Sequence, residues 1–481
     1  MKKLIVIVFI IFGAFLTLCL YKTFAYDTSV VEEVPSTTDL EYTFKIGNSS
    51  IKQITVDSGE TRYYDIVLGN PNNAKISYSV YYEMVSPSTK PDGYKIEYTS
   101  KSTGNSTGIV NNNGNITLNI VVTNTSSSSV TVKVGTVAGY VKGGELTLNS
   151  GQEVIPKRLT AAEYVMTLND NTSGDEGSGV YKIEHSAIPA SNSATGSEIP
   201  AVTDYRYYGP NPNNYICLDM EGGSTCPDKH LYRIIGSIYE EKENTNRIKL
   251  IKATPLTDGT TSAFSWDYTS SGSYSNIWAT ITSGNYSNSL TSGSTLMQLL
   301  NSGAWWNGTS GSYYNQSNTA TTVNFTNYKL SDKAKSYITT SRYYLGGFNN
   351  TPPLTNEMYG YERGTLRYDT NRPLYWEGMV GLMYPSDYGY AAGNSCVNGT
   401  KLYDYNGYGN KDWLYISDIY QSLMSPYSGH FCSLFSVGYA GRVVIDNDVF
   451  EDLAVSPVFY LTSTTSIIDG DGSLNNPYLL K

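Results

Sequence analysis

Histidine is scarce in this chain of 481 residues, which has only His185, His230 and His430. Each stands in a different stretch of sequence, and neither Gly-x-Ser-x-Gly nor His-Glu-x-x-His occurs. A nucleophile and its base meet in space rather than in sequence, so these absences argue against hydrolysis without excluding it. We therefore expect no enzyme and no catalytic residue, and an exported hydrolase is the weaker alternative.

Charge is also sparse, because Asp, Glu, Lys and Arg make up 16% of the residues. The formal net charge is −10, and no block of Lys and Arg follows the N-terminus. Nucleic acid is therefore not an expected partner. Ser, Thr, Asn and Gly are abundant, and 44 Tyr stand against 12 Phe. That balance is typical of rigid extracellular proteins, which hydrogen-bond through amides and hydroxyls.

An uncharged, mainly apolar run at residues 4–20 follows Lys2 and Lys3 and precedes Thr23-Phe24-Ala25. This order predicts an export signal over residues 1–25, with cleavage after Ala25. The run also approaches the length of a membrane span, so an uncleaved membrane anchor is the alternative. Either way, the positive-inside rule predicts an extracellular protein, secreted or anchored to the outer face of the membrane.

Four cysteines lie beyond this segment, and an even number in an exported chain predicts disulfides. Pairing close neighbours first, we expect Cys217–Cys226 and Cys396–Cys432, with buried free thiols as the alternative. The tight Cys-x-x-Cys or His spacing of a zinc site is absent. We therefore expect no metal site and no cofactor.

Residues 26–38 are polar and lack a helical or strand period, which predicts a linker arm. Alternating runs, separated by turns such as Pro-Asp-Gly, then fill residues 39–155. The predicted strands cover residues 42–46, 50–56, 61–68, 75–83, 94–99, 115–122 and 129–137. About seven strands at this spacing are typical of a β-sandwich.

The rest of the chain, residues 159–481, mixes helical and strand patterns. We expect a helix over residues 159–168 after Pro156, a hairpin of buried strands at 231–238 and 247–251, and short helices at 294–300 and 331–339. YWEGMVGLMYPSDYGY at 375–390 predicts a short buried strand that enters a tight turn. Residues 455–461 predict a second such strand, in which Pro457 marks an edge or a strand start. GDGSLNN precedes a predicted terminal strand.

Two resemblances add to these patterns. Phe24-Ala25-Tyr26 and YYDIVLGNPNNAKISYSVYY at 63–82 resemble the immunoglobulin-like sandwiches of exported Gram-positive proteins, including the camelysin and biofilm-fibre group. That resemblance covers residues 20–150 and implies a structural or spacer module. NNYIC, CPDKHLYRIIGSI, KLIKATPL, GLMYPSDYGYAA, VSPVFYL and GDGSLNNPYLL resemble an uncharacterised domain of exported proteins from Gram-positive gut bacteria.

This second family, over residues 160–481, is distantly similar to the C-type-lectin-like fold of variable binding proteins and formylglycine-generating enzymes. The closely spaced cysteine pair of the latter is missing, and so are the Glu-Pro-Asn and Trp-Asn-Asp elements of calcium-dependent lectins. The predicted fold class is therefore mainly β with an α+β part. An N-terminal immunoglobulin-like β-sandwich precedes a C-type-lectin-like α+β domain with long loops.

Four aromatic residues, Trp305, Trp306, Tyr313 and Tyr314, are flanked by Gly and Asn. Exposed rings stack on sugars or anchor protein partners, so we expect these four to contribute to a ligand-binding surface. The alternative is that one or both Trp fill the core. We therefore predict an exported cell-surface binding or adhesion protein that recognises a glycan or protein ligand through its C-terminal domain. The alternative is a structural subunit of a surface fibre that self-associates through the sandwich.

Overall fold

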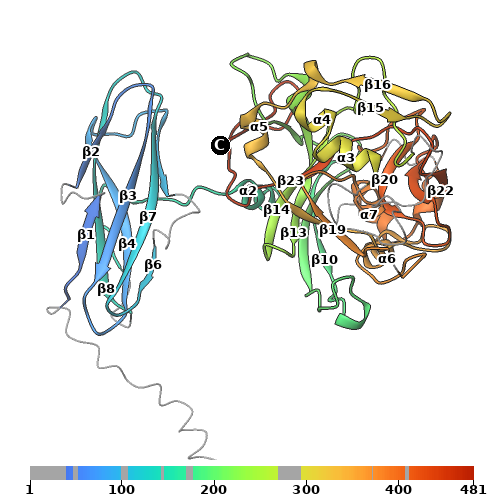
Figure 1. The fold of residues 1–481 in the computed structure, drawn as a ribbon. Helices are drawn as coiled ribbons and strands as arrows, with labels where there is room; N and C mark the ends of the chain where they lie inside the picture. The colour runs from blue at the N-terminus through green and yellow to red at the C-terminus, as the bar shows by residue number, and fades with distance from the viewer. Residues whose placement is uncertain are drawn as a thin grey trace, which may run out of the picture. The chain divides into compact units, whose positions relative to one another are not determined.

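The computed structural model describes residues 40–46, 52–98, 107–141, 146–169, 177–268, 294–370, 372–406 and 411–481. The chain divides into two compact units, Met1–Arg158 and Leu159–Lys481 (Figure 1). The predicted export signal and linker arm lie outside the described residues. Over the part of the chain that is described, no helix combines the length and the apolar character needed to cross a membrane.

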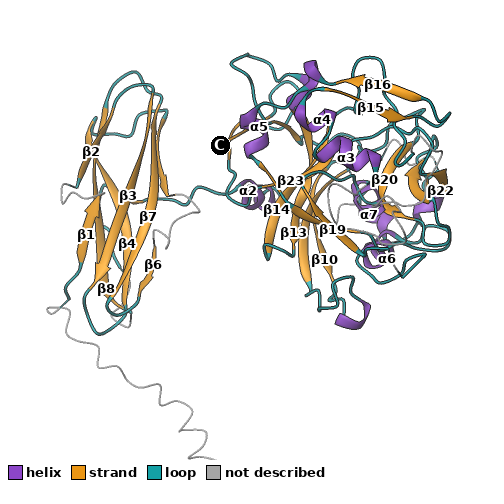
Figure 2. Cartoon of the chain, viewed as in Figure 1, coloured by secondary structure: helices purple, strands orange, loops and turns teal. Residues whose placement is uncertain are grey.

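Two antiparallel sheets make up the first unit, as Figure 2 shows. Their strands are β1 (Thr43–Ile46), β2 (Gln53–Val56), β3 (Glu60–Asn70), β4 (Ile76–Ser86), β5 (Tyr94–Tyr98), β6 (Thr107–Val110), β7 (Gly114–Asn124), β8 (Val130–Tyr140) and β9 (Gln152–Val154). One sheet has the order β1-β3-β7-β5. The other has the order β2-β8-β4-β6, and β9 pairs with β4.

A single apolar core lies between these two sheets and includes Val80, Leu118 and Val132. In β1 and β2 buried and exposed residues alternate, because successive side chains of a strand point to opposite faces. All seven predicted runs coincide with strands. The sequence patterns did not predict β6 and β9, which are short and rich in Thr, Gly, Gln and Glu rather than in alternating apolar residues.

The second unit is built on a nine-stranded sheet, with three smaller sheets beside it. Its strands are β10 (Gly179–His185), β11 (Val202–Tyr208), β12 (Tyr215–Cys217), β13 (Leu231–Glu240), β14 (Thr245–Lys252), β15 (Ser310–Tyr314), β16 (Ala320–Asn324), β17 (Ile338–Thr339), β18 (Ser341–Tyr344), β19 (Tyr375–Gly378), β20 (Gln421–Pro426), β21 (Ser433–Val437), β22 (Val443–Asp448), β23 (Val458–Leu461), β24 (Ile467–Asp469) and β25 (Tyr478–Leu480). The large sheet runs β17-β23-β14-β13-β12-β25-β24, and β11 joins β10 to β13.

Short helices connect and cover these strands. They are α2 (Ala161–Thr167), α3 (Thr295–Asn301), α4 (Ala304–Asn307), α5 (Asp332–Ser336), α6 (Thr355–Glu362), α7 (Pro385–Ala391) and α8 (Asn394–Val397). Single 3₁₀ turns occur at η2 (Ala190–Asn192), η3 (Asp228–His230), η5 (Thr326–Tyr328) and η6 (Leu402–Asp404). Strand residues outnumber helical ones, so the prediction of a mainly β protein is confirmed.

Local sequence explains several of these elements. Thr160 Oγ1 accepts the Glu163 N–H at 3.2 Å, and Glu163 Oε2 accepts the Thr160 N–H at 2.9 Å, which closes a capping box at the start of α2. Ser294 and Ser331 cap α3 and α5 with their hydroxyls alone, which accept the Met297 and Ala334 N–H groups. The helices predicted at 159–168 and 294–300, the β13–β14 hairpin and the terminal strand β25 are therefore confirmed. The helix predicted at 331–339 is right for α5 and wrong at its end, where Ile338–Thr339 form β17.

The prediction for residues 375–390 is only partly right. A strand is present, but β19 covers Tyr375–Gly378 and ends before the apolar residues 379–383 that suggested it, and the predicted turn is wrong. Pro385-Ser386-Asp387 begins α7. Proline suits the first helical position, and Asp387 Oδ2 accepts the Tyr384 N–H at 2.9 Å, which satisfies a backbone donor at the helix start. At the second predicted strand, Pro457 directly precedes β23, which pairs with both β14 and β17. Pro457 thus marks a strand start and not an edge strand.

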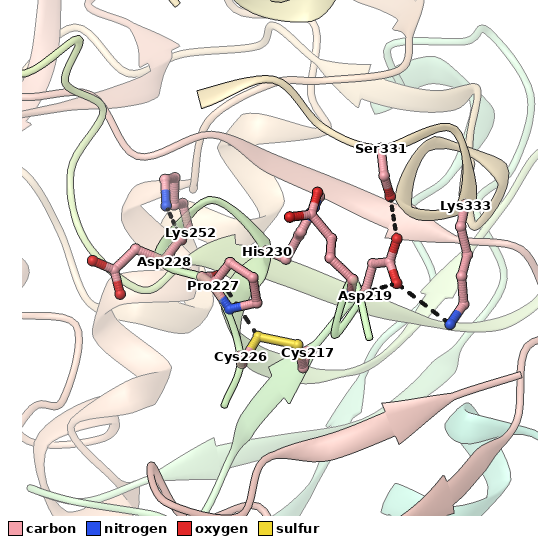
Figure 3. The surroundings of a disulfide bond; sticks show 10 residues. Cys217, Asp219, Cys226, Pro227, Asp228, His230, Lys252, Ser331 and Lys333 are labelled. Carbon is pink, nitrogen blue, oxygen red and sulfur yellow. Dashed lines mark hydrogen bonds and ion pairs between the residues drawn. A yellow bond between two sulfur atoms is a disulfide. The ribbon is translucent and has the colours of Figure 1, made fainter. Parts of the chain in front are cut away.

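Cys217 and Cys226 form the predicted disulfide, which joins the end of β12 to the residue before Pro227 (Figure 3). The predicted Cys396–Cys432 disulfide is wrong, since neither sulfur is in a disulfide. Cys432 Sγ instead lies 3.4 Å from His430 Nδ1 and 3.3 Å from Asp448 Oδ1. Cys396 is buried in α8 and is not bonded to Cys432. Their proximity in the sequence therefore did not predict the pairing correctly.

Replacing Cys217 and Cys226 together with serine is expected to lower the free energy of unfolding by about 2–4 kcal/mol, because the open loop regains conformational entropy when unfolded. The two cysteines are separated by nine residue positions. Urea unfolding with and without reductant measures the effect. Reductant should destabilise the wild type by the same amount and leave the double variant unchanged. An equal response of both proteins to reductant would contradict the assignment.

Candidate ligand-binding pocket

A pocket of about 510 Å³ lies between β10 and the helices α6, α7 and α8 of the second unit. Tyr359 and Tyr390, from α6 and α7, contribute aromatic rings to its lining. Three asparagines that line it, Asn356, Asn394 and Asn398, come from α6, from α8 and from the residue after α8. The pocket therefore combines aromatic rings with amide groups, which can both donate and accept hydrogen bonds.

His185, at the end of β10, is the titratable group that the fold holds most firmly in this pocket. Its ring stacks on Tyr359 with centroids 3.7 Å apart and planes inclined by 6°, and it meets Tyr390 edge-on at 5.7 Å. Nε2 lies 3.0 Å from Asp204 Oδ2. Among the described residues, Nδ1 has no hydrogen-bond partner. The His185 side chain is only 5% exposed, so its position is fixed by packing.

The protonation state of His185 follows from its surroundings. Burial lowers the pKa of His185, and the neighbouring Asp204 carboxylate opposes that shift only in part. The imidazole is therefore neutral at pH 7. Its Nε2–H donates to the Asp204 carboxylate, which leaves Nδ1 as a hydrogen-bond acceptor in the wall of the pocket.

Behind His185, four buried charges alternate in sign. Asp204 Oδ2 accepts from Arg206 Nη2 at 2.8 Å, Arg206 Nη1 donates to Asp387 Oδ1 at 2.8 Å, and Lys249 Nζ donates to Asp387 Oδ2. These four side chains are at most 1% exposed. Burial alone would raise the pKa of Asp204 and of Asp387, but the neighbouring cations outweigh it, and both pKa values are lowered. The four charges compensate one another. Their hydrogen bonds hold Asp204 in place, and Asp204 in turn orients the His185 ring.

The fold brings these groups together from distant parts of the chain. Asp204 and Arg206 stand two residues apart on β11 and pair in register with Ile183 and Tyr181 of β10. Lys249 comes from β14 and Asp387 from the first turn of α7. Charged residues within otherwise apolar strands were the sequence signal for this network, because such residues are seldom buried unless they are paired.

The rim of the pocket carries one exposed ion pair, Lys182 Nζ with Glu184 Oε1 at 2.5 Å. The side-chain hydrogen bond between the two raises the pKa of Lys182 and lowers the pKa of Glu184, so both stay charged at pH 7. Together with neutral His185, these residues give the lining no net charge. The pocket therefore suits an uncharged, polar ligand.

The four predicted aromatic residues do not form one exposed surface. Trp305, in α4, is 1% exposed and Tyr313, in β15, is 6% exposed, so both belong to the core. The expected surface role is thus wrong for these two, and the alternative of a core tryptophan is right for Trp305. Trp306 is half-buried under Lys335 Nζ, 5.1 Å from the ring centroid, and Tyr314 is also half-buried. A ligand contact of Trp306 or Tyr314 stays a prediction.

A second hollow of about 470 Å³ is lined by Tyr420, Tyr439 and Asp452, among others. Tyr439 is 56% exposed and meets Tyr420 edge-on, with centroids 4.3 Å apart. The lining of this second hollow includes no asparagine or histidine. We therefore regard the His185 pocket as the stronger candidate for recognition of a polar ligand.

No protein-family model, no curated protein and no solved structure matches this chain. The fold and the pocket by themselves define a mainly β protein of two compact units, of which the second carries an uncharged polar pocket. The resemblances to immunoglobulin-like sandwiches and to the C-type-lectin-like fold stay predictions.

Proposed function

We propose that this chain is an exported cell-surface binding protein whose second unit holds an uncharged glycan in the His185 pocket. The observation that carries the proposal is the combination of a neutral imidazole acceptor, three amides and aromatic rings in one pocket. On this proposal the first unit, an immunoglobulin-like sandwich, acts as a spacer, and the second unit is a C-type-lectin-like domain.

Sugar chemistry fits these groups. Each sugar hydroxyl both donates and accepts, so it can pair with His185 Nδ1 as acceptor and with either end of an asparagine amide. The C–H face of a pyranose ring is apolar and packs on the aliphatic side chains of the lining, Ile183 and Ile188, because His185 and Arg363 already cover the two faces of the Tyr359 ring. A volume of about 510 Å³ lies within the range of small-molecule sites, about 300–1,000 Å³. Since the lining has no net charge, neutral glycans fit better than acidic ones.

A glycan array probed with the full chain at pH 7 tests the proposal. We expect retention of neutral glycans and weaker retention of sialylated or sulfated ones. Binding should also weaken as the pH falls through the lowered pKa of His185, since protonation turns the Nδ1 acceptor into a donor. Burial raises the pKa of nearby Glu362 to about 7, so Glu362→Gln serves as the control and should keep the same pH profile.

Failure to retain any glycan would contradict the proposal. Growth of large assemblies with protein concentration, seen by light scattering without glycan retention, would support the fibre subunit instead. If the chain retained protein partners but no glycan, the His185 pocket would not be the recognition site, and another surface would have to be. If glycan affinity were the same at neutral and acid pH, His185 would not be a hydrogen-bond acceptor for the glycan.

A further inference from the structure

Three metal-binding side chains meet at one end of the β21–β22 hairpin, outside the glycan pocket. Asp448 is the last residue of β22, and its register partner is Ser433, the first residue of β21. Cys432 directly precedes β21, and its carbonyl accepts the Val449 N–H at 2.8 Å. His430 lies in the turn between β20 and β21, which the Tyr427 N–H closes by donating to Ser433 O at 3.0 Å. Strand pairing thus fixes the backbone beneath all three donors.

The two distances from Cys432 Sγ already match those between ligands around one metal ion. Cys432 Sγ lies 3.4 Å from His430 Nδ1 and 3.3 Å from Asp448 Oδ1. Together the three donor atoms lie within 4.8 Å of one another. In a tetrahedral zinc site, with Zn–S of about 2.3 Å and Zn–N or Zn–O of about 2.0–2.2 Å, adjacent ligand atoms stand about 3.3–3.6 Å apart. The two sulfur distances fit this range without rearrangement of the fold.

We propose that His430, Cys432 and Asp448 bind one Zn²⁺ ion, with a fourth position left to a water, to Ser433 Oγ or to a group from outside the chain. A thiolate, an imidazole and a carboxylate together favour zinc, whereas calcium and magnesium take all-oxygen sites. On binding, the Cys432 thiol releases its proton to solvent as the Zn–S bond forms. The charges of thiolate and carboxylate then balance that of the ion.

Access and support agree with this assignment. His430 is exposed, Asp448 is half-buried and Cys432 is buried, so the sulfur is shielded while an ion can enter from the His430 side. Ser433 Oγ lies 2.8 Å from Asp448 Oδ1 and 3.1 Å from His430 Nδ1, which places it close enough to the donor atoms to supply the fourth ligand. Ligand spacing in the sequence did not predict this site, because Asp448 stands 16 positions after Cys432 and reaches it only through the hairpin.

Titration of the reduced full chain with Zn²⁺ against a chromophoric chelator tests the site, and Co²⁺ serves as a second probe. We expect one ion per chain, and a sulfur-to-cobalt charge-transfer band with Co²⁺. Cys432→Ser and His430→Gln should each weaken zinc binding by at least about tenfold, the lower end of the loss seen when even outer-shell partners of a metal site are removed. Cys396→Ser is the matched control, because among the described residues it removes the other thiol outside the disulfide and should leave affinity unchanged.

Because His430 is exposed, its substitution leaves the fold intact and keeps the test valid if Cys432→Ser is unstable. Wild-type affinity in both ligand variants would overturn the assignment. Absence of zinc binding by the reduced wild type would overturn it as well. So would loss of the ion in Cys396→Ser with retention in Cys432→Ser.

Discussion

Replacing Asp387 with asparagine is expected to lower the free energy of unfolding by about 3–5 kcal/mol, because it removes the counter-charge of buried Lys249 and leaves buried Arg206 with Asp204 alone. Arg206 and Lys249 both donate to this carboxylate, and all three side chains are about 1% exposed. The asparagine amide keeps the shape of the side chain but carries no charge. Equilibrium unfolding in urea measures the loss.

The control for this substitution is Glu184→Gln, which removes one partner of the exposed Lys182–Glu184 pair. Solvent screens such a pair, so we expect no measurable change in stability. A comparable, small effect of both substitutions would contradict the account of the buried network. Each substitution removes one carboxylate from an ion pair. A difference in their effects on stability therefore reports the effect of burial.

Replacing Trp305 with alanine is expected to cost about 3–5 kcal/mol, because it removes a large side chain from the core and leaves a cavity. Trp305 is 1% exposed and packs with the buried residues around α3 and α4. Trp306, the next residue, is only half-buried and is the matched control. Its replacement should cost clearly less, because the side chain is already partly in water.

Thermal unfolding and glycan retention should be measured on the same preparations of both tryptophan variants. We expect Trp305→Ala to melt at a lower temperature and to retain glycan at temperatures where it is folded. Loss of retention in Trp305→Ala with an unchanged melting temperature would contradict its placement in the core. Loss of retention in Trp306→Ala alone would extend the ligand contact to that ring.

Local patterns in the sequence predicted much of the fold. The seven alternating runs of the first unit became strands, because a one-residue shift would expose their apolar face. The serines before α3 and α5 marked helix starts through hydrogen bonds that span only three residues, and apolar spacing after Pro156 marked α2. Prediction of secondary structure was less successful where the same short sequence is compatible with two local structures. Pro-Ser-Asp suits both a turn and the start of a helix, and packing decided for α7.

The sites were harder to predict because they depend on contacts between distant residues. Arg206 meets Asp387 across 181 positions, and no local pattern in the sequence encodes that approach. Glycines around Trp305 suggested an exposed loop. Gly308 instead takes a left-handed conformation, with φ of 63°, and ends α4 two positions after Trp306.

Gly360 offers the most direct test of glycan recognition in the His185 pocket. It lies in α6 and lines the pocket, and no heavy atom lies within 4 Å of a Cβ added there. Alanine fits this space and leaves the pocket open, whereas leucine extends into the volume proposed for the sugar. Both substitutions replace a helical glycine and should stabilise the helix by up to about 1 kcal/mol, so lost binding cannot be attributed to unfolding.

The decisive measurement is calorimetric titration of the glycan selected on the array into the wild type, Gly360→Ala and Gly360→Leu. The account predicts wild-type affinity for the alanine variant. For the leucine variant it predicts affinity at least about tenfold weaker, a loss of about 1.4 kcal/mol in binding free energy. Equal affinity of all three proteins would contradict recognition in the His185 pocket.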